Sequence, residues 1–514
     1  RYSSHFASVH RGQYFAEMKT TTVRKLLPET WGFLCPVHTP DGSPCGLLNH
    51  LAAAARTVVK RPSFDGTKAV TALLVALGLN VFEPTSKYNA MLRFNRTKHA
   101  WVMLDGRPLG FFEYTRMPHV EDKLRECKVL AQHGIPAELE VVSISKRSGR
   151  LYPGLFLFLG PGRLVRAVKC LRTGKIEMIG PLEQLFMNIS VLKEERDKAH
   201  AMLQDKGHRA SKEAAGGDAG EVQELPEQLP LRFAHEELEP TRMLSLLACL
   251  TPFSNHNQSP RNMYQCQMLK QTMGTPYHNH VYRTDNKVFR ILNPQKPMVR
   301  TKMYDAVNGD SHPIGTNAVV AVITYTGYDM EDAMLINKGS YERGFAHGAV
   351  YKTKIIEAAS NRINSDQARK CRFCNVTGQG KTAKRASDAL EDDGLPAIGT
   401  YLTKGAALYC IVDQTGRPKV TTYHDEEPCY VEQAILVDGA TLDPNAPCQR
   451  LMLKLRYQRN PVVGDKFSSR HGQKGVMSLL WPSEDMPFTD AGITPDILFN
   501  PHGFPPRGAT RMLL

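Results

Sequence analysis

The chain has 514 residues, of which 42% are hydrophobic and 23% charged, and this composition excludes a fibrous or largely disordered protein. A formal net charge of +14 favours a polyanionic partner, because a basic surface gains affinity by releasing counterions from phosphates, although many basic proteins bind no nucleic acid. The 11 scattered cysteines are typical of reduced thiols, and no apolar run approaches the ~20 residues of a membrane span. The length allows about three or four domains.

The beginning of the chain, residues 1–60, is expected to be irregular. Residues 1–25 carry five Lys or Arg against one acid, Glu17, with aromatic residues interleaved. Such cations can hold a phosphate backbone while aromatic rings stack on bases. Pro and Gly interrupt residues 31–46 too often for a helix, so a loop is expected there. The candidate nucleic-acid contacts of this region are Arg11, Lys19 and Arg24.

The remaining segments predict a multidomain, β-rich α+β protein. Residues 68–190 mix short apolar segments of helical and strand periodicity. Residues 192–230 are charged, rich in Ala and Gly and almost free of aromatics, which predicts a solvated helix, a flexible linker and a domain boundary. Strands are expected to dominate residues 285–355, a β-rich insertion is expected at 356–450, and residues 451–514 alternate strand-like and Gly/Pro-rich pieces.

An acidic turn follows a β-branched segment near the middle of the chain. Residues 319–325 (VVAVITY) predict a strand, which would present three carboxylates on the turn at 326–332 (TGYDMED). Carboxylates held at a strand end are ligands that Mg²⁺ takes together with substrate phosphates. An exposed acidic turn without metal is the alternative. Since neighbours on a strand point to opposite faces, at most one of Glu331 and Asp332 is expected to face a metal directly.

A basic segment lies closer to the end of the chain. Residues 454–475 carry six Lys or Arg, together with His471, against one acid, Asp465. Lys466 and Lys474 each follow a glycine by two residues, so each cation lies beside backbone that can approach a phosphate closely. A solvated basic loop is the alternative, and phosphate binding is the interpretation that we favour.

A helix is predicted to begin at Ser259, with Ser259 as N-cap and Pro260 at the first helical position. Arg261 and Gln265 then recur at helical spacing, followed by Met268 or Leu269, which places Arg261 and Gln265 on one face. Polar residues on a helix otherwise lined with Met and Tyr suggest a contact face. An amphipathic surface helix is the alternative.

Cys371 and Cys374 have the spacing of half a zinc site. Cys410 or Cys429 could complete such a site in space, but free thiols are the expected state and zinc is not expected. The sequence contains no Walker A motif and no nucleophile elbow.

Three of these segments resemble, in the same order, sequence blocks of the second-largest, β-type subunit of multisubunit RNA polymerases. They are residues 257–262 (NQSPRN), 327–332 (GYDMED) and 464–475 (GDKFSSRHGQKG). Residues 15–20 (FAEMKT) and 31–42 (WGFLCPVHTPDG) resemble the version in RNA polymerase I, with the polymerase II and III counterparts as the alternative.

The resemblance implies an architecture in which a split hybrid-binding region contains a double-psi β-barrel. The implied parts are a fork region at 1–60, external domains at 61–240 with the charged linker at 192–230, the first part of the hybrid-binding region at 241–350, a wall-like insertion at 351–450, and a second, truncated part of the hybrid-binding region at 451–514. Because the chain starts at Arg1 and family segments are missing at both ends, a piece of a longer subunit without activity of its own is expected.

The resemblance also implies roles for individual residues. Glu331 and Asp332 would lie near the second, nucleotide-borne Mg²⁺, directly or through water, whereas the permanently bound Mg²⁺ belongs to the largest subunit. The remaining roles are triphosphate contact for Arg261 and Arg507, contact with the RNA 3′ end for Lys466 and Lys474, and contact with nucleic acid for Gln265, Lys270, Gln271, Arg470 and His471. Two departures stand out: Leu269 replaces a usual Gly, and the segment around Arg507 matches the family only in part.

The function that the resemblance implies is DNA-directed synthesis of ribosomal RNA in the nucleus and nucleolus, by a nucleotidyltransferase active only with the largest subunit. The implied partners are that subunit and other polymerase subunits, template DNA, the RNA–DNA hybrid and NTPs, with no membrane. A nucleic-acid-binding scaffold that lacks catalysis is the alternative from a different class.

Overall fold

The structure is a computed structural model. It describes residues 2–18, 20–59, 64–82, 94–146, 152–199, 201, 233–358, 371–377, 384–413, 415–438 and 449–503. The predicted contacts Lys19 and Arg507, and residues 200 and 202–230 of the charged linker, therefore lie outside the described residues, whereas residues 193–199 form the mostly exposed helix predicted at its start. The chain divides into two compact units, Arg1–Ser254 with Asn262–Gln267 and Asn255–Arg261 with Met268–Leu514. No described helix has the length and apolar character that a membrane span needs.

The N-terminal part of the first unit is irregular, as predicted. Its short elements are α1 (Tyr2–Phe6), β1 (Ser8–His10), α2 (Gln13–Glu17), two 3-10 helices (Thr22–Arg24 and Pro28–Thr30), β2 (Leu48–His50) and β3 (Ala55–Thr57). β1 and β2 pair antiparallel, and turns and bends occupy most of residues 31–46. The Pro- and Gly-rich segment is thus the loop that its composition predicts.

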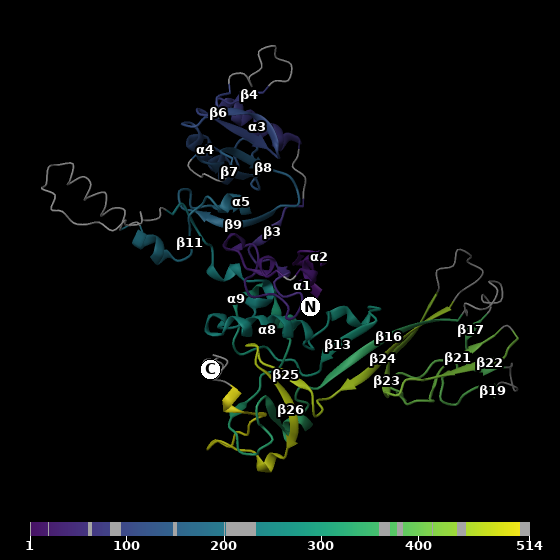
Figure 1. Ribbon diagram of the computed structural model, residues 1–514. Coiled ribbons are helices and arrows are strands. Elements are labelled where there is room, and N and C mark those ends of the chain that lie inside the picture. Colours follow the sequence, from purple (N-terminus) through teal and green to yellow (C-terminus); the bar gives the residue numbers. More distant parts are fainter. Residues whose placement is uncertain are drawn as a thin grey trace. The chain divides into compact units, whose positions relative to one another are not determined.

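A five-stranded sheet with two helices forms the main core of the first unit (Figure 1). Its strands, in spatial order, are β4 (Asn80–Val81), β6 (Arg107–Glu113), β5 (His99–Leu104), β8 (Gly154–Phe158) and β7 (Glu140–Ile144), and its helices are α3 (Phe64–Ala76) and α4 (Met117–Leu130). Alternate residues of β5 are buried. Asp105 and Gly106 join β5 to β6 with positive φ at both positions, the backbone that a tight hairpin requires. The α+β prediction for residues 68–190 is confirmed.

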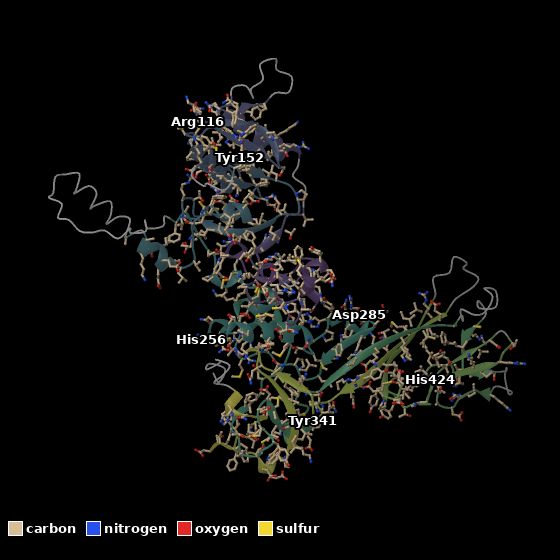
Figure 2. The ribbon with its side chains drawn as sticks, viewed as in Figure 1. Arg116, Tyr152, His256, Asp285, Tyr341 and His424 are labelled. Atoms are coloured by element: carbon tan, nitrogen blue, oxygen red, sulfur yellow. The ribbon has the colours of Figure 1, made fainter. Side chains whose placement is uncertain are left out.

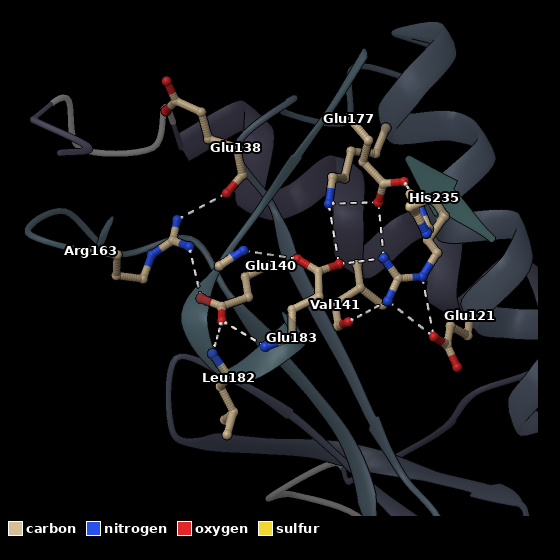
Figure 3. Close-up of polar contacts among 12 residues, drawn as sticks. Glu121, Glu138, Glu140, Val141, Arg163, Glu177, Leu182, Glu183 and His235 are labelled. Atoms are coloured by element: carbon tan, nitrogen blue, oxygen red, sulfur yellow. Dashed lines mark hydrogen bonds and ion pairs between the residues drawn. The ribbon is translucent and has the colours of Figure 1, made fainter. Parts of the chain in front are cut away.

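A second sheet of the first unit contains β10 (Ile176–Ile179), β9 (Leu164–Cys170), β12 (His235–Glu236) and β11 (Ile189–Ser190), with β3 also pairing with β9. The short helix α5 (Pro181–Gln184) follows β10. Charged side chains are buried here, among them Glu183 of α5, labelled in Figure 3, at 0% exposure and Lys128 of α4 at 2%. Such charges are tolerated in an interior only when they are paired.

Three long strands, β16, β24 and β23, lie side by side in the second unit (Figure 1). They belong to a sheet of β13 (Lys287–Ile291), β16 (Gly348–Glu357), β24 (Gln449–Arg459), β23 (Cys429–Asp438) and β20 (Tyr401–Leu402). Leu451, Leu453 and Leu455 alternate along β24 and are fully buried. Further short strands are β17 (Arg372–Phe373), β21 (Ala407–Val412) and β22 (Pro418–Thr422), and the pair β18 (Val376–Thr377) and β19 (Lys384–Arg385). The strand-rich character predicted for residues 356–450 is confirmed in the described part.

The sheet that carries the candidate site is mixed parallel and antiparallel. Its order is β14 (Val320–Val322), β27 (Ile497–Phe499), β15 (Ala333–Asn337), β26 (Lys474–Trp481) and β25 (Lys466–Ser468). β15 runs parallel to β26 and antiparallel to β27. Helix α10 (Lys338–Glu342) follows β15, and its Tyr341, labelled in Figure 2, packs edge-on against His347.

Two sequence predictions near this sheet need correction. The strand predicted at 319–325 is only Val320–Val322, because the chain leaves the sheet to form the loop that carries the carboxylates. Strands also do not dominate all of residues 285–355, since 292–319 contain helix α9 (Lys302–Ala306), a 3-10 helix and irregular backbone but no strand. Pro and Gly are frequent in that stretch, and both are poor strand formers.

Candidate functional site

The acidic loop between β14 and β15 separates its three carboxylates. Asp329 is fully buried, and its Oδ1 accepts hydrogen bonds from the hydroxyls of Thr324 (3.0 Å) and Thr326 (3.3 Å). Glu331 is exposed and has left-handed backbone, with φ of 54°, while Asp332 is half-buried. The expectation of three carboxylates on the turn is therefore wrong, because Asp329 braces the loop from inside. Glu331 remains at the surface, and Asp332 is partly exposed.

Strand pairing brings this loop against the basic segment, which is distant in sequence. The N–H of Val476 on β26 donates to the carbonyl of Asp332 at 2.9 Å, just before β15 starts. A Cβ on Gly475 would lie 3.0 Å from the sulfur of Met334 and 3.2 Å from the same Asp332 carbonyl. Glycine thus permits the close approach of the two segments.

Strands β25 and β26 form a ribbon with one open face. Lys466 lies opposite Val476 and Ser468 opposite Lys474, so these four side chains project to the same side. Both lysines are exposed, whereas Phe467 and Met477 turn to the other side, where Phe467 is half-buried and Met477 is 1% exposed. The two predicted phosphate ligands therefore share one solvent-facing surface, next to the strand that Asp332 precedes.

The turn of this ribbon packs on the N-terminus of α8 (Ser259–Gln271). Gly472 has φ of 73°, and a Cβ there would lie only 2.3 Å from the carbonyl oxygen of Arg261. The side-chain amide of Asn257 lies 3.0 Å from Nδ1 of His471. Within the second unit, the beginning of the block at 257–262 therefore lies against the block at 464–475, which in turn pairs with the strand that follows the block at 327–332.

The start of α8 differs in detail from its prediction. Ser259 is already helical, and the N-cap is Gln258, whose side chain makes no capping hydrogen bond. Pro260 still lies within the first turn, where the missing N–H costs nothing. Gln265 is 3% exposed, so its amide faces the protein interior and not an open contact face. Two further predicted nucleic-acid contacts follow Gln265 along α8: Lys270 is half-buried and Gln271 is exposed.

Arg470 and His471, in the ribbon turn, are enclosed more than a basic loop would be. The guanidinium of Arg470 donates to the carbonyl of Val299 at 2.7 Å, and burial lowers the pKa of Arg470. Burial, with the adjacent charge of Arg470, lowers the pKa of His471 to about 4. His471 is therefore neutral at pH 7 and works in the turn as a hydrogen-bonding group. The cations that face solvent on the ribbon are the lysines.

Near the N-terminus, Arg24 has a structural role that the sequence did not indicate. Its guanidinium donates to the carbonyls of Ser43 (2.5 Å) and Cys45 (2.9 Å), and its own carbonyl would lie 2.5 Å from a Cβ on Gly46. Arg24 therefore holds the loop together. Arg11 is exposed, and its backbone N–H donates to the carbonyl of Leu47 at 3.1 Å. Its role as a nucleic-acid contact stays a prediction.

The acidic loop could hold a metal ion only in part. Glu331 and Asp332 supply carboxylate oxygens, which suit Mg²⁺, but two side chains cannot complete an octahedron of oxygen ligands. The residues thus fit an ion that phosphates and water mainly hold.

Of the two cysteines with zinc-like spacing, Cys374 donates its thiol hydrogen to the carbonyl of Val376 at 3.3 Å, and burial raises the pKa of Cys371.

Another group of side chains of metal-binding type lies in the first unit. Among the described residues, Cys170, Glu177 and His235 place one ligand-type atom each within 4.8 Å of one another. No sequence motif joins these three residues, because they lie on three strands and the charged linker separates His235 from the other two. No local spacing signal could have found this group.

Comparisons with known proteins match the chain in all its main parts. A family model described as RNA polymerase Rpb2, domain 6, matches residues 247–514, and one described as RNA polymerase Rpb2, domain 3, matches residues 1–57. A third, described as RNA polymerase I, Rpa2 specific domain, matches residues 109–166. The first match covers more than half of the chain and includes the acidic loop and the basic ribbon.

Relatives that match this chain over nearly its whole length are subunits of RNA polymerase I. The chain is 46% identical over 519 residues to DNA-directed RNA polymerase I subunit RPA2 of Homo sapiens, which covers 100% of this chain and 41% of that protein. It is 43% identical over 514 residues to DNA-directed RNA polymerase I subunit RPA135 of Saccharomyces cerevisiae, covering 99% of this chain and 38% of that protein. The chain thus spans about two fifths of the length of these relatives. It belongs to the Rpb2 family of RNA polymerase subunits, in the branch of RNA polymerase I.

Proposed function

We propose that this chain is the part of an RNA polymerase I second-largest subunit that binds the RNA–DNA hybrid, the incoming NTP and the second Mg²⁺. The proposal rests above all on one observation: strand register puts Lys466 and Lys474 on one open face of a ribbon whose neighbour, β15, begins directly after Asp332. Anionic oxygens of RNA or a nucleotide would meet two cations there, with carboxylates close in the sheet. The similarity to polymerase I subunits of two organisms supports it.

The chemistry needs no protein nucleophile. In nucleotide addition the RNA 3′ hydroxyl attacks the α-phosphate, and the protein contributes positioning and neutralisation of charge. A nucleotide-borne Mg²⁺ supplies Lewis-acid stabilisation of the departing pyrophosphate. Asp332 and Glu331 would help to hold it, Lys466 and Lys474 would fix the RNA 3′ end and nearby phosphates, and Arg261 would bind the triphosphate, as would Arg507 in the part of the chain not described.

The catalytic unit would be the assembled enzyme, since the permanently bound Mg²⁺ is expected on the largest subunit. We infer that the mixed sheet with β15 and β26 belongs to a double-psi β-barrel that packs on the largest subunit. Template DNA, the hybrid, NTPs and other polymerase subunits are then the partners, and the nucleus, specifically the nucleolus, is the proposed location. Ribosomal RNA would be the product.

The test is single-nucleotide addition by a polymerase reconstituted with the full-length subunit carrying Lys474→Ala. A hydrogen bond to a charged group contributes about 1.5–3 kcal/mol, so a loss of roughly 10-fold to 100-fold in rate is expected. Lys419→Ala, which removes an exposed lysine from β22, is the matched control. An unchanged rate in Lys474→Ala would refute the proposed role.

The scaffold alternative has its own test. A Glu331→Ala/Asp332→Ala double variant is expected to require more Mg²⁺ for RNA extension. If extension by this variant keeps the wild-type Mg²⁺ dependence, the carboxylates do not serve catalysis and a purely nucleic-acid-binding role is favoured.

A further inference from the structure

Strand register brings four segments of the first unit to one end of its five-stranded sheet. β5 begins at His99 opposite Glu113, where β6 ends, so the turn before β5 lies beside the residue that follows β6. β8 begins at Gly154, opposite Ile144 at the end of β7, and β8 runs parallel to β5. The residues just outside these strand ends therefore gather in one place. They are Arg96, Lys98, Tyr114, Lys146 and Tyr152, and we call the three cations among them the basic end of the sheet.

The turn that carries Arg96 and Lys98 is held by several hydrogen bonds. Oδ1 of Asn95 accepts from the N–H of Thr97 at 2.9 Å and from its hydroxyl at 2.6 Å. The N–H of Asn95 donates to Nδ1 of His99 at 2.9 Å, and the carbonyl of Asn95 accepts from the N–H of Lys98 at 3.0 Å. Arg96 and Lys98 thus project from a fixed backbone, which reduces the entropy that is lost when a ligand binds.

Tyrosine rings restrain two of the three cations. Cζ of Arg96 lies 5.6 Å from the ring centre of Tyr152, which Figure 2 labels. Nζ of Lys146 lies 5.8 Å from the ring centre of Tyr114 and donates to the carbonyl of Thr97 at 3.1 Å. Burial raises the pKa of Tyr114, Tyr152 raises it further and Arg96 lowers it, which agrees with the closeness of these groups. Both cations are exposed, so the rings limit their motion without hiding their charge.

Carboxylates do not neutralise the basic end in the described part of the chain. Its three cations form no ion pair with any described residue, whereas Lys404, an exposed lysine of the second unit, pairs with Glu426 at 3.2 Å. Glu113 is the acid among the described residues of the four segments, and its Oε2 accepts from the hydroxyl of Thr115 at 3.4 Å. The positive charge is therefore available to an anionic ligand.

The composition of this surface fits phosphates better than it fits a protein partner. Protein interfaces are anchored by aromatic and aliphatic side chains and are depleted of charge at their centre. Among the described residues of the four segments, Tyr152 is the exposed large hydrophobic side chain, at 42%, and Arg96 lies over its ring. Phosphates need only cations held in place, because the release of condensed counterions drives their binding. Charge complementarity therefore points to the backbone of a nucleic acid.

We propose that the basic end binds the phosphate backbone of duplex DNA, outside the site that binds the hybrid. An enzyme that transcribes duplex DNA meets duplex on either side of the opened stretch, and a contact with phosphates there adds affinity without sequence preference. The proposal goes beyond the proposed function and rests on it only for the presence of DNA. It does not depend on the roles of Lys466 and Lys474.

The test measures the binding of a fluorescent duplex of about 30 base pairs to a polymerase reconstituted with the full-length subunit, between about 50 and 200 mM KCl. Each phosphate contact contributes about 0.9 to the slope of the logarithm of the association constant against the logarithm of salt concentration. Arg96→Ala/Lys98→Ala/Lys146→Ala should therefore flatten this slope by about 2–3. An unchanged slope overturns the proposal.

The matched control is Lys123→Ala/Arg283→Ala/Lys404→Ala, which removes the same number of charges from exposed ion pairs. Arg283 also lies over a tyrosine ring, at 5.4 Å from its centre. The control should change the slope by less than about 0.9. If both triple variants flatten the slope equally, net charge alone is responsible and the proposal fails.

A variant that keeps the charges guards against misfolding. Arg96→Lys/Lys98→Arg/Lys146→Arg should have the wild-type slope. If its slope is as flat as that of the alanine variant, the loss reflects the local structure and not phosphate contacts, and the proposal is overturned.

Fluorescent poly-glutamate identifies the class of partner. If the alanine variant loses poly-glutamate binding but keeps the wild-type slope for DNA, the basic end serves an acidic protein and the DNA proposal is wrong.

A second background separates the basic end from the candidate active site. The alanine variant should flatten the slope equally in a polymerase that also carries Lys466→Ala/Lys474→Ala, and a flattening that disappears there would contradict a site outside the hybrid-binding surface. An unchanged rate of nucleotide addition in Lys474→Ala would refute the proposed function alone, since the slope for duplex DNA is measured without nucleotide addition.

Discussion

Replacement of Gly472 by Ala would test whether the ribbon turn is locked onto α8 at the point where the candidate site is assembled. Glycine occupies this position with φ of 73°, which costs an alanine about 1–2 kcal/mol. The added Cβ would also lie 2.3 Å from the carbonyl of Arg261, although ordinary contacts begin at 3.4 Å. Overpacking of this kind adds about 1–3 kcal/mol, so the local cost is about 2–5 kcal/mol.

The control separates the contact from the backbone strain. Gly492 has nearly the same φ, 79°, but a Cβ there meets nothing within 4 Å. Gly492→Ala should therefore lose only the free energy of placing an alanine at positive φ. Gly472→Ala should lose that free energy and, in addition, the free energy of the clash with Arg261. The difference in free-energy cost between the two variants estimates how firmly the ribbon turn and α8 are held together.

Two measurements on the full-length subunit report the outcome. Hydrogen exchange of residues 469–473 should accelerate in Gly472→Ala by the local free energy lost, and single-nucleotide addition in the reconstituted polymerase should slow, because Lys474 directly follows the displaced turn. Equal exchange in the Gly472→Ala and Gly492→Ala variants would refute the reasoning. It would mean that the turn and α8 shift apart at no cost.

Three further predictions follow from contacts of single side chains. Asp329→Ala leaves two threonine hydroxyls without their acceptor, at about 1–3 kcal/mol, and should open residues 323–332 to limited proteolysis. His471 has a lowered pKa, so its stabilisation is complete above about pH 6.5 and is lost as pH falls through about 4; His471→Gln should remove this acid dependence from unfolding curves. Arg24→Ala should speed hydrogen exchange at 42–46, whereas Arg11→Ala should not.

Composition and periodicity predicted the fold well where the signal is local. The alternating Leu451, Leu453 and Leu455 indicate a strand, and the Pro- and Gly-rich segment near the N-terminus indicates a loop. Partner choice is not local. That Asp332 meets Val476 depends on the pairing of β15 with β26, and only the family resemblance suggested that the two blocks share a site.

The burial of individual polar residues could not be predicted either. Asp329 and Asp332 are the same residue type three positions apart, yet one is enclosed by threonine hydroxyls and the other reaches the surface. Arg24 appears in the sequence as one more cation of a basic lead, and the structure uses it on backbone carbonyls. Both outcomes depend on how the loop returns on itself, which no propensity encodes.

The β25–β26 ribbon divides anchoring from exposure between its two sides. Phe467 and Met477 attach one side to the protein, while Lys466 and Lys474 stand on the other. Length, charge and hydrogen-bonding capacity at the two lysine positions can therefore vary with little effect on the packing behind them. Substitutions at the two exposed lysine positions are therefore expected to change ligand binding more than they change folding.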